Sequence, residues 1–144
     1  MTRLLFICHG NICRSPMAEA VMKYLVTKAG REAEFEIASC ATSAEELGHD
    51  VYPPARRELA RHGIPCPTRR AVRLTAADYE RFDRLICMER YNRRNALSLL
   101  GGDPQGKLCT LHPDRDVADP WYSDDFETAY RDIEEGCRRL LDTL

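Results

Sequence analysis

The residues of this chain best suited to phosphate chemistry are cysteines followed by an arginine after five intervening positions. A cysteine thiolate is a strong nucleophile, and the planar guanidinium of arginine binds two phosphate oxygens at once. With seven cysteines in 144 residues, chance alone produces about one such pair. Three pairs have this spacing: Cys8/Arg14, Cys87/Arg93 and Cys109/Arg115.

Two of these pairs enclose residues that oppose anion binding. The loop after Cys87 contains Glu89, whose carboxylate repels both a thiolate and a phosphate. The loop after Cys109 contains Pro113, which has no N–H to donate, and Asp114, another anion. We therefore interpret both spacings as coincidences.

The loop from Cys8 to Arg14 has the composition of an anion-binding turn. Gly10 and Asn11 tolerate the tight backbone conformations of such a loop, and Asn11 is among the few residues that adopt a positive φ. No proline interrupts the loop, so every N–H is available to an anion. Cys8 is thus the candidate nucleophile and Arg14 the candidate phosphate ligand.

A buried strand and a helix must hold this loop. Residues 4–7 are a continuous apolar run, which is typical of a strand buried on both faces. Ser15 and Pro16 open a helix that ends at Gly30. The positive end of that helix faces the loop and stabilises a bound anion and a Cys8 thiolate. We expect Ser15 both to hydrogen-bond the sulfur and to cap the helix.

The remainder of the chain alternates strands and helices without repeats or linkers. Thr75 with Asp78 forms a capping box, and Asp124 with Glu127 is expected to cap the last helix. The pattern predicts one α/β domain over residues 1–144, a three-layer fold with a four-stranded parallel sheet flanked by helices on both faces. Its ligand site should lie at the carboxyl ends of the strands, where the phosphate loop follows the first strand. Further strands are expected at 34–39, 85–88 and 108–111, and further helices at 53–62, after 88 up to 100, and from 124 to the end.

Composition excludes several classes of function. Hydrophobic residues make up 44% and charged residues 31%, and the net charge of −2 gives no reason to expect nucleic-acid or membrane binding. No signal sequence and no apolar stretch of roughly 20 residues is present, so we expect a cytoplasmic protein with reduced thiols. The four histidines are dispersed and no CxxC pair occurs, so neither a metal nor another cofactor is expected.

A phosphate ester also needs a proton donor for its leaving oxygen. Two Asp-Pro dipeptides are candidates. Asp103 lies between glycines and is read as an ordinary surface turn. Asp119 is followed by Trp121, Tyr122 and the last helix, which can anchor its loop, and we assign the proton to Asp119.

The chain resembles the low-molecular-weight protein tyrosine phosphatases over essentially its whole length. The motifs that carry the resemblance are FICHGNICRSPMAE at 6–19, SCATS at 39–43, HGIP at 62–65, DYERFDRLICM at 78–88 and ADPWYSDDFETAY at 118–130. The resemblance implies hydrolysis of phosphotyrosine through a phosphocysteine intermediate, with Asp119 as general acid and then base. It also implies that phosphate or substrate contacts come from His9, Gly10, Asn11, Ile12, Cys13, Ser15, Trp121 and Tyr122.

Cys13 matches a second cysteine that is typical of the family. A reversible disulfide between Cys8 and Cys13, protecting the nucleophile from over-oxidation, is the functional interpretation. Simple packing of Cys13 is the alternative, and the five remaining cysteines are interpreted as core or incidental thiols.

Several positions depart from the family pattern. Glu45 and Glu46 stand where an aromatic residue usually walls the substrate cleft, and they either disfavour acidic peptides or are merely solvated. His9 replaces an apolar loop residue, and Glu89 replaces an aspartate. The stretch that usually supports the phosphate loop is altered in this chain, where it reads RRAVR at 69–73. Arg69 is the candidate substitute for the usual supporting residue.

Three other functions stay open at this point. The related protein-arginine phosphatases carry a small threonine where this chain has Ile12, so Ile12 favours an aryl ester. An arsenate reductase of this type needs an additional pair of resolving cysteines, of which only Cys87 is in the expected region. A phosphopeptide-binding module without catalysis is the third. The expected partner is a phosphotyrosine-containing protein or peptide, such as a tyrosine kinase substrate, and the expected state is a monomer or weak dimer.

Overall fold

The structure is a computed structural model that describes residues 1–144. Its centre is a four-stranded sheet in the order β2-β1-β3-β4, and all neighbouring strands are parallel. The first strand therefore lies inside the sheet, between two neighbours. The strands are β1 (Thr2–Cys8), β2 (Phe35–Ala41), β3 (Arg84–Cys87) and β4 (Leu108–Thr110).

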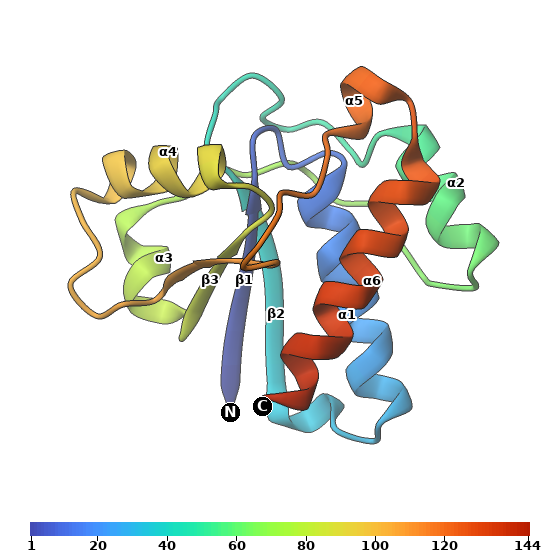
Figure 1. The fold of residues 1–144 in the computed structure, drawn as a ribbon, viewed down its shortest axis with the longest axis horizontal. Coiled ribbons are helices and arrows are strands. Elements are labelled where there is room, and N and C mark those ends of the chain that lie inside the picture. Colours follow the sequence, from blue (N-terminus) through green and yellow to red (C-terminus); the bar gives the residue numbers. More distant parts are fainter.

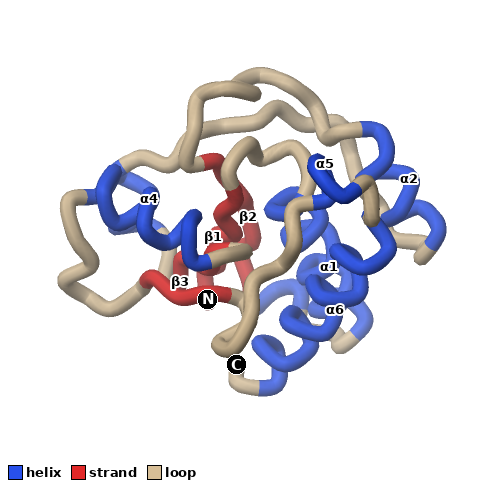
Figure 2. The backbone as a smooth tube through the Cα atoms, turned by 45° about the horizontal axis from the view of Figure 1, so that its top comes forward, coloured by secondary structure: helices blue, strands red, loops and turns tan.

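Helices cover both faces of the sheet, as the alternating pattern predicts. In Figure 1, α1, α2 and α6 lie on one side of the strands and α3 and α4 on the other. The loops that follow β1 and β2 lie, with the short α5, at one end of the molecule (Figure 1 and Figure 2), beyond the carboxyl ends of these strands. None of these helices is long and apolar enough to cross a membrane. They are α1 (Arg14–Lys28), α2 (Pro53–Arg61), α3 (Ala76–Arg81), α4 (Arg90–Leu100), α5 (Pro120–Ser123) and α6 (Phe126–Asp142), with a 3₁₀ turn, η1, at Glu32–Glu34.

Strand β1 is buried on both faces, which explains its unbroken apolar run. Leu4 and Phe6 pack in the larger core cluster with residues of α1 and α6, whereas Leu5 and Ile7 pack in a smaller cluster with residues of α3. All four are at most 2% exposed. Burying such a side chain contributes roughly 1.5–3 kcal/mol. The strand that ends at Cys8 is therefore a rigid base for the loop that follows.

All four strands differ at their boundaries from the expected ranges: β1 is longer at both ends, and β3 spans Arg84–Cys87 where 85–88 was predicted. The second strand begins at Phe35 and continues to Ala41, because Glu34 belongs to the preceding 3₁₀ turn. The fourth strand ends at Thr110, one residue before the predicted boundary at Leu111. The extension of β2 carries the chain alongside the end of β1, where Ala41 pairs with Cys8.

The predicted cap of the last helix is wrong by one residue. Asp125 caps α6 and accepts a hydrogen bond from the N–H of Thr128 at 3.0 Å. Asp124 instead has a left-handed conformation, with φ of 59°, and ends α5. The capping box of Thr75 and Asp78 at the start of α3 is confirmed.

Asp103 has a structural role beyond the surface turn that its glycine neighbours predict. Its carboxylate accepts hydrogen bonds from the Tyr79 hydroxyl at 2.6 Å and from the N–H groups of Lys107 and Leu108 at 2.8 and 3.1 Å. Burial alone would raise the pKa of Asp103, but these hydrogen bonds hold it below its usual value. Asp103 thus ties α3 to the start of β4.

Candidate active site

The loop of residues 9–13 connects Cys8, at the end of β1, to Arg14, at the start of α1. Its positive φ falls on Asn11 (60°) and not on Gly10. Gly10 leaves room for a neighbouring side chain: a Cβ at this position would lie 3.3 Å from Cγ of Glu46, a tight contact. The loop is therefore tight in its backbone and closely packed against the segment after β2.

The backbone of this loop offers unused hydrogen-bond donors. The N–H groups of Gly10 and of residues 12–15 donate to no other group of the protein. Those at Arg14 and Ser15 belong to the first turn of α1, where helical geometry leaves the N–H groups without partners. Together with the positive end of the helix dipole, these donors form a site that favours an anion.

The Cys8 sulfur receives two polar contacts in an otherwise buried position. Ser15 Oγ lies 2.9 Å from it, and the N–H of Asn11 donates to it at 3.3 Å. A thiolate has no proton, so Ser15 is the donor when Cys8 is ionised. The expected second role of Ser15 is wrong: the N-cap of α1 is Cys13, and no side chain caps this helix end.

A polar network lies behind the loop and fixes Asn11 and Ser15. The Asn11 amide donates to Ser15 Oγ at 2.8 Å and to Ser39 Oγ at 3.0 Å. Arg69 donates to Asn11 Oδ1 at 2.7 Å and pairs with Glu19 at 2.8 Å. Arg69 thus supports the loop from behind, as its position in the altered stretch led us to expect. We call these five residues the Arg69 network.

Arg14 is buried and surrounded by acceptors. Its side chain is 2% exposed, donates to the Val117 carbonyl at 2.9 Å, and lies 3.1 Å from Glu89 and 3.3 Å from Asp119. Burial alone would lower the pKa of Arg14, but Cys8, Asp119 and Glu89 together raise it above its ordinary value. A permanent cation therefore stands beside the sulfur. Glu89, the departure from the family's aspartate, orients this cation.

Asp119 lies at the edge of the same cleft, with its side chain 24% exposed. One carboxylate oxygen accepts from the N–H of Trp121 at 3.0 Å and so caps α5. The Trp121 ring in turn packs on Tyr52, with centroids 4.9 Å apart, and Tyr52 packs on Phe126 at 6.0 Å. The short helix and this aromatic stack place the carboxylate, and neither was predicted from the sequence.

Most predicted site residues meet in one cleft of about 140 Å³. Asn11 and Ser15 are the exceptions, because their side chains belong to the Arg69 network behind the loop. Sequence reasoning missed Ser39 and Tyr52. Ser39 belongs to the SCATS motif, which offered a signal, whereas nothing marked Tyr52. The lining residues are Cys8, His9, Gly10, Ile12, Cys13, Arg14, Glu45, Glu46, Asp119, Trp121 and Tyr122.

Cys13 lines the cleft beside Cys8, and both thiols are free. Burial, and then the charge of Cys8, raises the pKa of Cys13 to about 12. Cys13 is therefore a neutral thiol at physiological pH. Three of the other cysteines, Cys40, Cys87 and Cys137, are buried in the core as expected.

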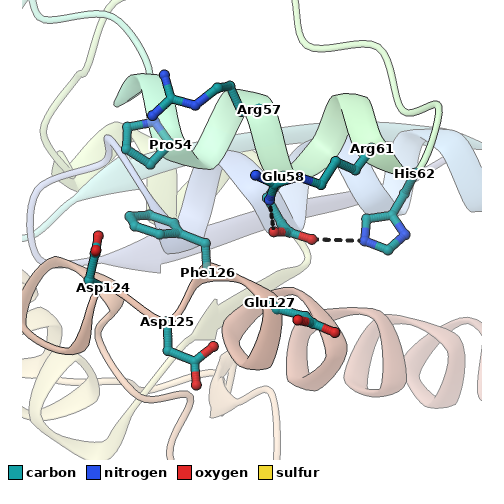
Figure 3. Close-up of a pocket in the computed structure, with 9 residues that line it drawn as sticks. All are labelled: Pro54, Arg57, Glu58, Arg61, His62, Asp124, Asp125, Phe126 and Glu127. Carbon is teal, nitrogen blue, oxygen red and sulfur yellow. Dashed lines mark hydrogen bonds and ion pairs between the residues drawn. The ribbon is translucent and has the colours of Figure 1, made fainter.

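A larger groove of about 640 Å³ lies elsewhere, between α2 and the start of α6 (Figure 3). Its one buried charge, Glu58, is paired with Arg61 at 2.5 Å and with His62 at 2.9 Å. The groove contains no cysteine, serine or threonine among its lining residues. No cluster of His, Cys, Asp and Glu in the chain is arranged to hold a metal ion. Cys8, Arg14 and Asp119 all line the cleft at Cys8 and none of them lines this groove.

Comparison with known proteins agrees with this geometry. The family model described as "Low molecular weight phosphotyrosine protein phosphatase" matches residues 3–144. The human protein of that name is 37% identical over 96% of this chain and 93% of its own length. A Bacillus subtilis relative, the low-molecular-weight protein-tyrosine-phosphatase YfkJ, is 32% identical over 100% of this chain and 96% of its own length.

Solved structures match the fold as closely. The crystal structure of YfkJ superposes with a TM-score of 0.95 over 99% of this chain and 94% of its own. The low-molecular-weight protein tyrosine phosphatase of Streptococcus pyogenes is 34% identical and has a TM-score of 0.93, with coverage of 100% and 93%. The four-stranded sheet and the arrangement of its helices are therefore common to all three chains.

Proposed function

Because the chain belongs to the low-molecular-weight phosphotyrosine protein phosphatase family and is a phosphatase, we propose that it hydrolyses phosphotyrosine through a phosphocysteine on Cys8. The observation that carries this proposal is the convergence of a hydrogen-bonded Cys8 sulfur, unused loop N–H groups and a buried Arg14. Each of these groups interacts with a different part of a phosphate ester.

In the first step, the Cys8 thiolate attacks phosphorus in line with the bond to the tyrosine oxygen. The S–P bond forms as the P–O bond breaks, and Asp119 gives its proton to the departing phenol oxygen. Arg14 and the loop N–H groups hold the remaining phosphate oxygens, whose charge is spread over them in the transition state. The hydrogen bond between Asp119 and the N–H of Trp121 keeps the carboxyl group at the cleft edge.

In the second step, water hydrolyses the phosphocysteine. The Asp119 carboxylate, now without its proton, takes one from the attacking water. The S–P bond breaks, inorganic phosphate leaves, and Cys8 returns as a thiolate stabilised by the Ser15 hydroxyl. Asp119 thereby regains from water the proton that it gave to the phenol, and the site returns to its starting state.

An aryl substrate fits the walls of the cleft. Ile12 and the rings of Trp121 and Tyr122 line it, and they provide apolar contacts for a phenyl ring. Phosphoarginine has a longer, cationic leaving group and is the competing substrate. The substrate we propose is accordingly a phosphotyrosine-containing protein or peptide.

A protective disulfide between Cys8 and Cys13 is the second element of the proposal. Both thiols line the cleft, and Cys13 stays protonated. Peroxide oxidises the Cys8 thiolate to a neutral sulfenic acid, which removes one of the charges that raise the pKa of Cys13. The Cys13 sulfur then bonds to the Cys8 sulfur, and the sulfenic hydroxyl leaves with the Cys13 proton as water. A cellular thiol reduces it and restores the nucleophile.

Purified protein tests the reaction directly. We expect release of phosphate from phenyl phosphate and from a phosphotyrosine peptide, and no release by Cys8→Ser. Cys66→Ser, which changes a half-buried cysteine outside the cleft, is the matched control and should keep full activity. Activity that survives in Cys8→Ser contradicts the mechanism, and faster hydrolysis of phosphoarginine than of phosphotyrosine contradicts the substrate.

A further inference from the structure

The mouth of the cleft is strongly acidic. Glu45, Glu46 and Asp119 line it, and the one arginine among the lining residues, Arg14, is 2% exposed. Arg14 already forms ion pairs with Glu89 and Asp119. Its charge therefore acts on a phosphate at the base of the cleft and does little to offset the two glutamates at the rim.

Backbone hydrogen bonds attach the segment that carries these glutamates to the phosphate loop. The N–H of Thr42 donates to the Cys8 carbonyl at 3.0 Å, and the N–H of Ser43 donates to the His9 carbonyl at 3.1 Å. Further along, the N–H of Gly48 donates to the Ala71 carbonyl at 3.0 Å. The rim is thus held in a fixed position relative to the phosphate site.

The two glutamate side chains are also held individually. Glu46 lies beside Gly10, where an added Cβ would come within 3.3 Å of its Cγ, and it hydrogen-bonds His49 at 2.6 Å. Glu45 hydrogen-bonds the His9 ring at 3.1 Å, while its own side chain remains 69% exposed. His9 therefore positions the Glu45 carboxylate at the mouth and leaves most of it accessible to a substrate.

We propose that Glu45, supported by Glu46, is a specificity-determining residue that selects phosphotyrosine flanked by lysine or arginine over phosphotyrosine flanked by aspartate or glutamate. This rests on the proposed function. A peptide whose phosphate reaches Cys8 must pass its neighbouring residues over the rim. Carboxylates fixed there attract cationic side chains and repel anionic ones, and such charges at an exposed rim act mainly on encounter and specificity.

Two peptides of equal length test the proposal, each with one phosphotyrosine, flanked by basic residues in one and by acidic residues in the other. At low ionic strength we expect kcat/KM of the wild-type protein to be about three- to tenfold higher for the basic peptide. At about 0.5 M salt the ratio should approach one, because screening shortens the range of these interactions.

Glu45→Gln should lower the ratio at low ionic strength by at least about twofold. Glu80→Gln is the matched control, since it removes the same charge from an exposed position on α3 outside the cleft and should leave the ratio unchanged. A wild-type ratio at or below one, or a ratio that Glu45→Gln does not change, overturns the inference. Phenyl phosphate distinguishes a failure of this inference from a failure of the proposed function, because it has no flanking residues. A wild-type protein that does not hydrolyse phenyl phosphate contradicts the proposed function itself.

Discussion

Arg69 Nη2 lies 2.7 Å from Asn11 Oδ1, so an arginine 58 positions along the chain directly supports the phosphate loop. Asn11 needs this support because it holds the positive φ on which the shape of the loop depends. The same asparagine donates to Ser15, whose hydroxyl contacts the Cys8 sulfur. A continuous set of hydrogen bonds thus connects Arg69 to the candidate nucleophile.

Replacing Arg69 with methionine should disturb the loop without touching the cleft. The variant removes the cation that contacts Asn11 Oδ1 and Glu19 Oε1, and Lys23 remains as the only cationic partner of Glu19. We expect a loss of about 1–3 kcal/mol in the free energy of unfolding. We also expect weaker inhibition by inorganic phosphate, because the loop N–H groups lose their alignment. Arg69→Lys, which retains the charge, should recover part of both effects. An unchanged inhibition constant in Arg69→Met would exclude a positioning role.

Replacing Ser15 with alanine should impair the nucleophile specifically. The hydroxyl donates to a charged sulfur, and such bonds contribute about 1.5–3 kcal/mol, so kcat/KM should fall about 10- to 100-fold. Iodoacetate should alkylate Cys8 more slowly, because the sulfur loses the Ser15 hydrogen bond that stabilises its anionic form. Ser98→Ala, at an exposed position of α4, is the control. Equal alkylation rates in the wild type and Ser15→Ala argue against thiolate stabilisation.

Replacing Cys13 with serine should make oxidation harder to reverse. The wild-type protein treated with peroxide should regain activity on addition of dithiothreitol, because its Cys8 sulfenic acid is captured as a disulfide. In Cys13→Ser, the sulfenic acid lacks the one other thiol that lines the cleft, and prolonged peroxide should inactivate the enzyme permanently. Mass spectrometry of the Cys8 peptide identifies the product. Equal recovery in both proteins means that Cys13 only packs.

Replacing Asp103 with asparagine should destabilise the fold in a pH-dependent way. The pKa of Asp103 is below its ordinary value in the folded protein. Its stabilising effect is therefore complete above the ordinary value and is lost as the pH falls through the lowered one. At pH 7 the free energy of unfolding of Asp103→Asn should be about 1–3 kcal/mol lower than that of the wild type. This difference should shrink in acid, as the wild-type carboxyl becomes protonated. Urea unfolding at several pH values measures this difference, with the exposed Asp114→Asn as control. A difference that does not change with pH contradicts a stabilising role of the ionised Asp103 carboxylate.

Local patterns made the central part of the fold predictable. The apolar run of β1, the proline-free loop after Cys8 and the helix that follows each leave a short-range signal in the sequence. Alternation of strands and helices then indicates a parallel sheet, and its carboxyl edge indicates where the site lies. Cys8 and Arg14 could therefore be selected as candidates, because the composition of the loop between them and its place between a strand and a helix set this pair apart from two others with the same spacing.

Features that depend on tertiary contacts could not be predicted. The four-residue α5 exists because Asp119 caps it and Trp121 packs on Tyr52, and neither interaction has a local pattern. Adjacent aspartates made the cap of α6 ambiguous, since either can accept a hydrogen bond from the first turn. Glu19 reads as an ordinary residue of a helix, and only the approach of Arg69 gives it a role.

The most direct test of the proposed chemistry is to trap the phosphorylated enzyme. Wild-type protein is mixed rapidly with an isotopically labelled aryl phosphate, quenched in acid and digested, and the peptide that carries phosphate is identified. We predict a burst of one equivalent of phenol per enzyme molecule and phosphate bound to Cys8, with neither in Cys8→Ser. Label on another residue, or turnover in Cys8→Ser without a labelled cysteine, would contradict a phosphocysteine mechanism.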